Sequence, residues 1–272
     1  MGEASKVEEK GLWSQIWVYG VIVIAVFVLI FYIVKPIDVT LLLEPSGVPI
    51  AEFTGELILI TLSALAALVF LLVARQFKWF ETKTGQIAFL ITLGFLLWTI
   101  AEAVFFGYEL MGIEPFPSIA DGFYIAGYVP FAIALILNIR TVKMKFKPLT
   151  LAIWIVASVA IFLALLFVEF IPFLMEGITL DSLSLIYPLE DFILLVLVLV
   201  IVLKFRSGEI AKPWGLLVAG FILDAIGDTW YTYISWYESE LPAYNLYDLF
   251  FIFSYLAMFA SGLYFIWLYK GR

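Results

Sequence analysis

The chain contains eight long apolar stretches separated by short polar segments, and this pattern constrains the fold more than any motif does. A helix needs about 20 apolar residues to cross the ~30 Å hydrocarbon layer of a bilayer. Hydrophobic residues make up 64% of the 272 residues and charged residues only 14%, whereas a typical soluble domain is about half apolar. We therefore predict an all-α, multi-pass protein of the cell membrane, embedded in the lipid bilayer, with eight transmembrane helices near 13–35, 56–76, 86–108, 121–139, 148–170, 187–204, 214–236 and 247–268.

Basic residues are unevenly divided between the two sides of these predicted spans. Fourteen of the fifteen Lys and Arg residues fall in the terminal segments and in alternate loops, and only Lys35 falls on the opposite side. Loops rich in Lys and Arg stay in the cytoplasm. Both termini are thus predicted to be cytoplasmic, with residues 1–12 as a polar N-terminal segment. Because the cytoplasmic loops are short, any intracellular output would pass through the helices or through a separate signalling protein.

Several kinds of chemistry are excluded by residue types that the chain lacks. It has no Cys and no His, so it offers no thiolate nucleophile, no imidazole base and no sulfur or imidazole metal ligand. Hydrolysis by a Ser-His-Asp or Cys-His arrangement is excluded for the same reason. Scarcity of labile residues is typical of thermophile proteins. We expect no cofactor and no nucleic-acid partner, and a catalytic activity is not indicated.

The chain contains an internal repeat. Gly94–Glu102 (GFLLWTIAE) matches Gly220–Asp228 (GFILDAIGD), and Asp121–Tyr128 (DGFYIAGY) matches Asp248–Tyr255 (DLFFIFSY). We interpret the match as a duplication into two tandem four-helix repeats, residues 13–147 and 148–272. An even number of spans per repeat makes both repeats enter from the same side. They would then be related by a pseudo-two-fold axis along the membrane normal, with any shared site between them.

Acidic residues lie within the predicted spans. Helical rise places Asp224 about 15 Å, Asp228 about 21 Å and Glu102 about 24 Å from the cytoplasmic edge. Acids at such depths are costly and are functional candidates by default. Because Asp224 and Asp228 are four residues apart, they share one helix face, where like charges repel. Either one of them is protonated or a cation lies between them.

Other polar and aromatic side chains surround these acids in the outer half of the predicted helices. Asp121 and Asp248 begin their helices, where an N-cap role is sufficient to explain a carboxylate. Interfacial solvation explains Glu190 and Asp191, and an aromatic belt explains Trp230 and Tyr231. Tyrosines such as Tyr128 and Tyr255 could donate to the buried acids and join the two repeats. The candidate ligand-binding residues are Glu102, Asp121, Tyr128, Glu190, Asp191, Asp224, Asp228, Trp230, Tyr231, Asp248 and Tyr255.

Short motifs across most of the chain after residue 50 resemble a prokaryotic family of multi-span membrane sensory regions. They are Pro117–Tyr128, Tyr187–Asp191, Gly227–Tyr231 and Asp248–Tyr255. Members of that family are often found ahead of diguanylate cyclase (GGDEF), EAL or histidine kinase modules. The resemblance implies a membrane fold that receives a signal. No output module follows the last predicted span, which departs from the family pattern.

Three functions remain open at this point. The first is a receptor-like protein whose outward-facing acidic and aromatic cavity binds a cation, a small cationic ligand or a lipid headgroup. The second is a secondary transporter coupled to Na⁺ or H⁺, which duplication and the midplane Asp224 favour. The third is an intramembrane aspartyl protease, in which two carboxylates share a proton to activate water. For the third, both acids of the pair lie on one helix, where two helices would be expected.

Overall fold

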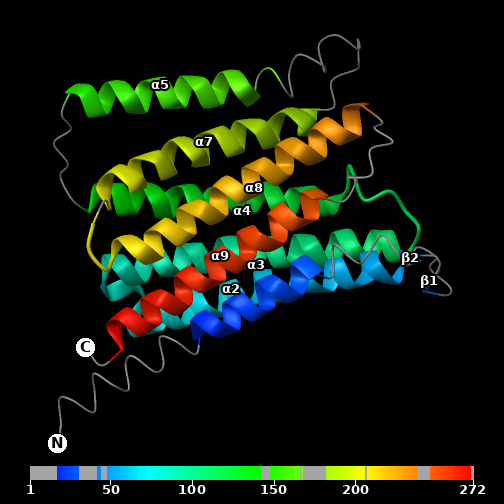
Figure 1. Ribbon diagram of the computed structural model, residues 1–272, viewed down its shortest axis with the longest axis horizontal. Coiled ribbons are helices and arrows are strands. Elements are labelled where there is room, and N and C mark those ends of the chain that lie inside the picture. The colour runs from blue at the N-terminus through cyan, green and yellow to red at the C-terminus, as the bar shows by residue number, and fades with distance from the viewer. Residues whose placement is uncertain are drawn as a thin grey trace, which may run out of the picture.

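The computed structural model describes residues 17–30, 42–43, 48–141, 148–165, 167, 182–205, 207–237 and 246–270. Long α-helices make up almost all of this part of the chain (Figure 1). They are a helix over Trp17–Ile30, α2 (Ile50–Gln76), α3 (Lys83–Leu110), α4 (Ile119–Arg140), α5 (Pro148–Leu165), α7 (Ser182–Lys204), α8 (Ala211–Tyr237) and α9 (Leu246–Tyr269). Two-residue strands β1 (Leu42–Leu43) and β2 (Val48–Pro49) pair antiparallel, and a 3₁₀ turn, η2 (Trp79–Glu81), joins α2 to α3.

Six of the described helices are long and apolar enough to cross a membrane: α2, α3, α4, α5, α7 and α9. The helix over Trp17–Ile30 is apolar but shorter, and α8 carries the two acids Asp224 and Asp228. The prediction of an all-helical, multi-pass membrane protein is confirmed at this level, while the count of eight spans stays a prediction. The predicted segment 1–12 and the predicted span ends 13–16, 31–35 and 168–170 lie outside the described residues.

The helices form a bundle in which α3 packs against α4 and α8 packs against α9. Between these pairs, α2 contacts both α3 and α9, and α7 contacts both α4 and α8. α5 lies at the edge of the bundle beside α7 (Figure 1). The interior is filled by large side chains such as Phe95, Trp98 and Phe131, which are at most 2% exposed.

Glycines let the paired helices approach closely. A Cβ at Gly94 of α3 would lie 2.6 Å from the ring of Phe131 in α4, and a Cβ at Gly220 of α8 would lie 2.3 Å from Cγ of Met258 in α9. Small residues at helix contacts are how membrane helices gain packing energy, because lipid gives little hydrophobic drive for association. Gly127 of α4 has the same role toward Trp98, with a Cβ position 2.4 Å from Cδ1 of the indole.

Substituting Gly127 by alanine is expected to destabilise the protein by about 1–3 kcal/mol, because the added methyl group overpacks a buried indole. Thermal unfolding in detergent micelles measures the change. The matched control is Gly122→Ala on the same helix, where a Cβ meets nothing within 4 Å. That variant should be neutral or gain up to ~1 kcal/mol from better helix propensity. Equal midpoints for the two variants would contradict the close approach of α3 and α4.

Polar contacts join several helix ends at the side of the bundle where basic residues concentrate. Nζ of Lys204, at the end of α7, donates to Oδ1 of Asn138 and to Oγ1 of Thr141, both at 2.7 Å, and also to the carbonyl of Asn138 at the end of α4. Glu209 lies just before α8. Hydrogen bonds from Lys212, the larger effect, and from Tyr264 lower the pKa of the Glu209 carboxyl group below its usual value. The carboxylate of Glu209 thereby links the start of α8 to the final turns of α9.

Candidate functional site: a buried acid and tyrosine cluster

Tyr128 of α4 connects two acids from two other helices. Its hydroxyl lies 2.9 Å from Oδ1 of Asp191 in α7 and 3.0 Å from Oδ2 of Asp228 in α8. Tyr128 is 4% exposed and Asp191 only 2% exposed. A phenol has a single proton to donate. Both hydrogen bonds can therefore form at full strength only if one of the carboxyl groups is protonated and donates to the phenol oxygen.

A third acid, Asp224, completes a cluster of three carboxyl groups. The cluster consists of Asp191, Asp224 and Asp228. Each contributes one carboxylate oxygen, and these three oxygens lie within 4.8 Å of one another. Asp224 is 4% exposed, and its Oδ1 accepts a 3.3 Å hydrogen bond from the hydroxyl of Ser254 in α9. Three ionised carboxylates this close together, inside an apolar bundle, would repel one another strongly. Protons or a bound cation must offset that repulsion.

Glu102 of α3 forms the equivalent tyrosine–acid pair with Tyr255 of α9. Its Oε1 accepts a 2.5 Å hydrogen bond from the hydroxyl of Tyr255, and Glu102 is 6% exposed. The two tyrosine–acid contacts cross the structure, since a tyrosine of α4 reaches α8 and a tyrosine of α9 reaches α3. The indole of Trp98 lies between them, with ring centroids 5.3 Å from Tyr128 and 6.0 Å from Tyr255.

Asp121 serves the start of α4 and its contact with α7. Ser118 is the N-cap residue, and Asp121 completes a capping box as the third helical residue, with Oδ2 accepting from the Ser118 backbone at 2.6 Å. Asp121 was expected to begin the helix as its N-cap, but α4 begins two residues earlier, at Ile119, because Ser118 is the N-cap. Its Oδ1 accepts a 2.7 Å hydrogen bond from the hydroxyl of Tyr187. Asp248 lies in the first turn of α9.

The remaining candidates have different surroundings. Glu190 is half-buried beside Asp191, and its Oε2 has no hydrogen-bond partner among the described residues. Tyr231 stacks edge-on against Tyr247 with ring centroids 5.2 Å apart, and Trp230 lines an apolar cavity. The structure thus brings together Asp191, Asp224, Asp228 and Tyr128, with Glu102 and Tyr255 across Trp98 from them.

Sequence reasoning missed three side chains that organise the site: Trp98, Tyr187 and Ser254. A signal for two of them was present in the repeat. Trp98 matches Asp224, and Gly127 matches Ser254 in the aligned motifs. The contact between Trp98 and Gly127 in one half therefore corresponds to the hydrogen bond between Asp224 and Ser254 in the other. An apolar contact and a polar contact occupy matching positions.

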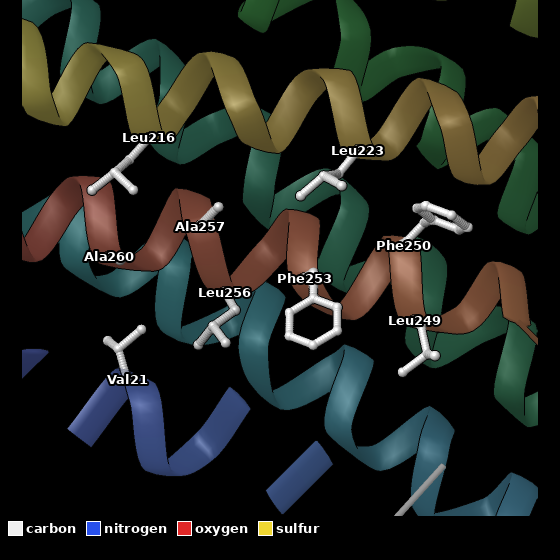
Figure 2. Close-up of a pocket in the computed structure, with 9 residues that line it drawn as sticks. All are labelled: Val21, Leu216, Leu223, Leu249, Phe250, Phe253, Leu256, Ala257 and Ala260. Carbon is white, nitrogen blue, oxygen red and sulfur yellow. The ribbon is translucent and has the colours of Figure 1, made fainter. Parts of the chain in front are cut away.

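Two cavities are described in the structure, and both are lined with apolar side chains. One, of about 540 Å³, lies between Val21 of the first described helix and residues of α8 and α9. Figure 2 shows its walls, with Leu216 and Leu223 on α8 and Phe253 and Leu256 on α9. The second, of about 560 Å³, lies between α5, α7 and α8. No acidic residue lines either cavity.

Comparisons of the chain with family models, with curated proteins and with solved structures found no match. The arrangement of acids, tyrosines and helices is therefore the basis for any functional assignment.

Proposed function

We propose that the chain is a receptor-like integral membrane protein that binds a cation between α7 and α8. The observation that carries the proposal is the cluster of Asp191, Asp224 and Asp228, whose carboxylate oxygens lie within 4.8 Å of one another. Buried acids in membrane proteins mark ion pathways and ligand sites, because they are expensive to keep in lipid without a use. A cation converts their mutual repulsion into coordination.

The chemistry of the donors favours a small, hard ion over an organic ligand. Carboxylate oxygens suit Mg²⁺, Ca²⁺, Mn²⁺ and protons. The hydroxyls of Tyr128 and Ser254 contact the same carboxyl groups and add neutral oxygens nearby. The oxygens of the three acids are too close together to leave room for a lipid headgroup between them. The acid cluster therefore suits a bare ion better than a small organic cation or a lipid headgroup.

Duplication supports a site shared between two halves. In the duplication, α2, α3 and α4 of the first half correspond to α7, α8 and α9 of the second half. The contact of α2 with α9 then corresponds to the contact of α7 with α4, and both contacts are present. The close approach of Gly94 to Phe131 becomes that of Gly220 to Met258, and both occur. The outer helices differ: Trp17 contacts Tyr264 of α9, whereas α5 contacts α7. Three helices in each half therefore support the duplication best.

A receptor role follows from how the cluster connects the halves. Tyr128 joins α4 to both α7 and α8, so an ion that displaces its hydrogen bonds would change the contact between the halves. The resemblance to membrane sensory regions and the predicted cytoplasmic location of both termini agree with this role. The signal would be passed to a separate partner protein at the basic ends of the helices.

Cation binding can be measured as thermal stabilisation of the purified protein. Ca²⁺, Mg²⁺ and Mn²⁺ are each titrated at constant ionic strength. At a free ion concentration 100 times its dissociation constant, a specifically bound ion should raise the free energy of unfolding by about 2.7 kcal/mol. The stabilisation should disappear in Asp228→Asn and persist in Glu114→Gln, which changes an exposed acid outside the helices. If all three ions leave the wild-type midpoint where it was, or shift Asp228→Asn as much as wild type, the cation site is refuted.

One observation favours cation transport as a second function. The continuous helices that carry Tyr128 and Asp191 each contain an internal proline, Pro130 and Pro188. Proline frees a backbone carbonyl from its hydrogen bond within the helix, and freed carbonyls near intramembrane acids coordinate ions in transporters. Flux of labelled Na⁺ or of protons into proteoliposomes, lost in Asp191→Asn, would identify transport. Ion-induced stabilisation without any flux would identify reception alone.

A further inference from the structure

Polar side chains lead from one end of the bundle to the three-acid cluster. α4 and α7 both begin at the end opposite Lys204, which we call the outer end (Figure 1). There the hydroxyl of Tyr187 in α7 donates to Asp121 in α4 at 2.7 Å. One turn further along α7 is Asp191 of the cluster, and two turns further along α4, a rise of roughly 10 Å, is its partner Tyr128. Polar contacts between α4 and α7 therefore continue from the outer end to the cluster.

The inner side of the cluster is closed by apolar side chains. Phe131 lies one turn inward from Tyr128 on α4, and Phe221 lies one turn inward from Asp224 on α8. Their rings meet edge-on with centroids 5.2 Å apart, and both residues are at most 3% exposed. On α7 the buried side chains inward of the cluster are also apolar: Leu194, Val198 and Ile201. Such side chains offer no oxygen to replace the hydration shell of an ion, so the cluster is closed toward the basic ends of the helices.

Glu190 lies at the open side of the cluster. It precedes Asp191 in α7 and is half-buried, and its carboxyl group is close enough to that of Asp228 for the two to repel each other when ionised. Oε2 of Glu190 is buried and has no hydrogen-bond partner among the described residues. Within the cluster, Asp228 is partly exposed, whereas Asp191 and Asp224 are only 2% and 4% exposed. An approaching cation would therefore meet Asp228 first, with an oxygen of Glu190 beside it.

We propose that the cation reaches the cluster from the outer end alone, between α4 and α7, and that Glu190 binds it first and passes it to Asp228. This inference rests on the proposed function. An ionised carboxylate at the mouth of a site raises the local concentration of cations and the rate at which they enter. Because Phe131 and Phe221 close the inner side, the site fills and empties without carrying ions across the membrane. A receptor for an external cation needs such a one-sided site.

Substituted cysteines test the route, because the chain has no native Cys. Single variants are exposed to a membrane-impermeant methanethiosulfonate with a quaternary ammonium group, in right-side-out and in inverted membrane vesicles. Glu190→Cys should react on the order of tenfold faster than Leu189→Cys, because a thiolate forms in water and not in lipid. Leu189 is the matched control, since it is adjacent on α7 but 54% exposed where lipid covers it. Glu190→Cys should react from the face opposite to that of Ser207→Cys, an exposed position between α7 and α8. Tyr187→Cys, one turn outward, gives a second reading of the same route.

Binding kinetics test the capture role of Glu190. Association of Mn²⁺ is followed in stopped flow through its quenching of tryptophan fluorescence in the full-length protein. Glu190→Gln should lower the association rate on the order of tenfold. The dissociation constant should change less than the rate, because the bound ion is held by the three cluster acids. Glu190→Asp keeps the charge and should restore the rate, which a role in packing alone does not explain.

Three results overturn the inference. Glu190→Cys and Tyr187→Cys may react no faster than Leu189→Cys, both may react from the same face as Ser207→Cys, or Glu190→Gln binds Mn²⁺ at the wild-type rate. Labelling needs no bound ion, so a failure of the cation site is recognised separately. Wild type that binds no Mn²⁺ refutes the proposed function and the capture role together, whereas the labelling pattern still shows whether water reaches Glu190 from the outer end.

Discussion

Trp98→Ala is expected to destabilise the folded protein by about 3–5 kcal/mol, the usual cost of truncating a fully buried large aromatic side chain. Trp98 is 2% exposed. Its ring lies 4.8 Å from Phe131 and 6.0 Å from Tyr255 between centroids, and its Nε1 donates to the backbone oxygen of Tyr124 at 3.1 Å. Truncation would remove contacts to α4 and to α9 at once. It would also open a cavity between the two tyrosine–acid pairs.

The control for this prediction is Leu96→Ala, two residues earlier on the same helix, where the side chain is 46% exposed and faces away from the bundle core. In a micelle or bilayer that change removes lipid contacts only, and it should shift stability by less than ~1 kcal/mol. Denaturant or thermal unfolding of both variants decides the matter. Similar losses for the two would mean that α3 is rotated from the orientation described, with Trp98 facing lipid.

The helices could be predicted well from the sequence because membrane spans obey a length rule. Each of the predicted spans overlaps a described helix, and α2, α3, α4, α7, α8 and α9 extend beyond the predicted spans by a few residues. α3, for instance, begins at Lys83 where the prediction began at 86, because Thr82 caps it outside the apolar run. Hydropathy locates the portion in hydrocarbon, while caps and loops decide where the backbone stops being helical.

The site could be predicted in part. The repeat motifs identified Glu102, Asp228, Tyr128 and Tyr255, and all four take part in tyrosine–acid hydrogen bonds. The partners could not be assigned, because a repeat shows which positions are equivalent and not which helices meet. Tyr128 contacts an acid of the other half, a pairing that depends on how α4 and α7 pack.

The grouping of Asp191 with Asp224 and Asp228 had no sequence signal either. Asp191 was explained by solvation at the membrane surface, since it lies near the outer end of an apolar run. In the structure it is 2% exposed, because α7 starts at Ser182 and continues outward past it. The extra turns place Asp191 inside the bundle, at the level where α8 carries its two acids.

The three-acid cluster should make stability and cation binding oppose each other, and Asp224→Asn tests this. The amide keeps an oxygen that accepts from Ser254 but removes one of the three ionisable carboxyl groups. Without added cation the variant should therefore be more stable than wild type, and the ~2.7 kcal/mol gained from a saturating ion should be lost. Asp121→Asn is the matched control, because its carboxylate lies in a capping box. That control should lose about 0.5–2 kcal/mol of stability and keep the response to the ion. An Asp224→Asn protein that is less stable than wild type, or that still responds to the ion, would show that repulsion among these acids is not what a cation relieves.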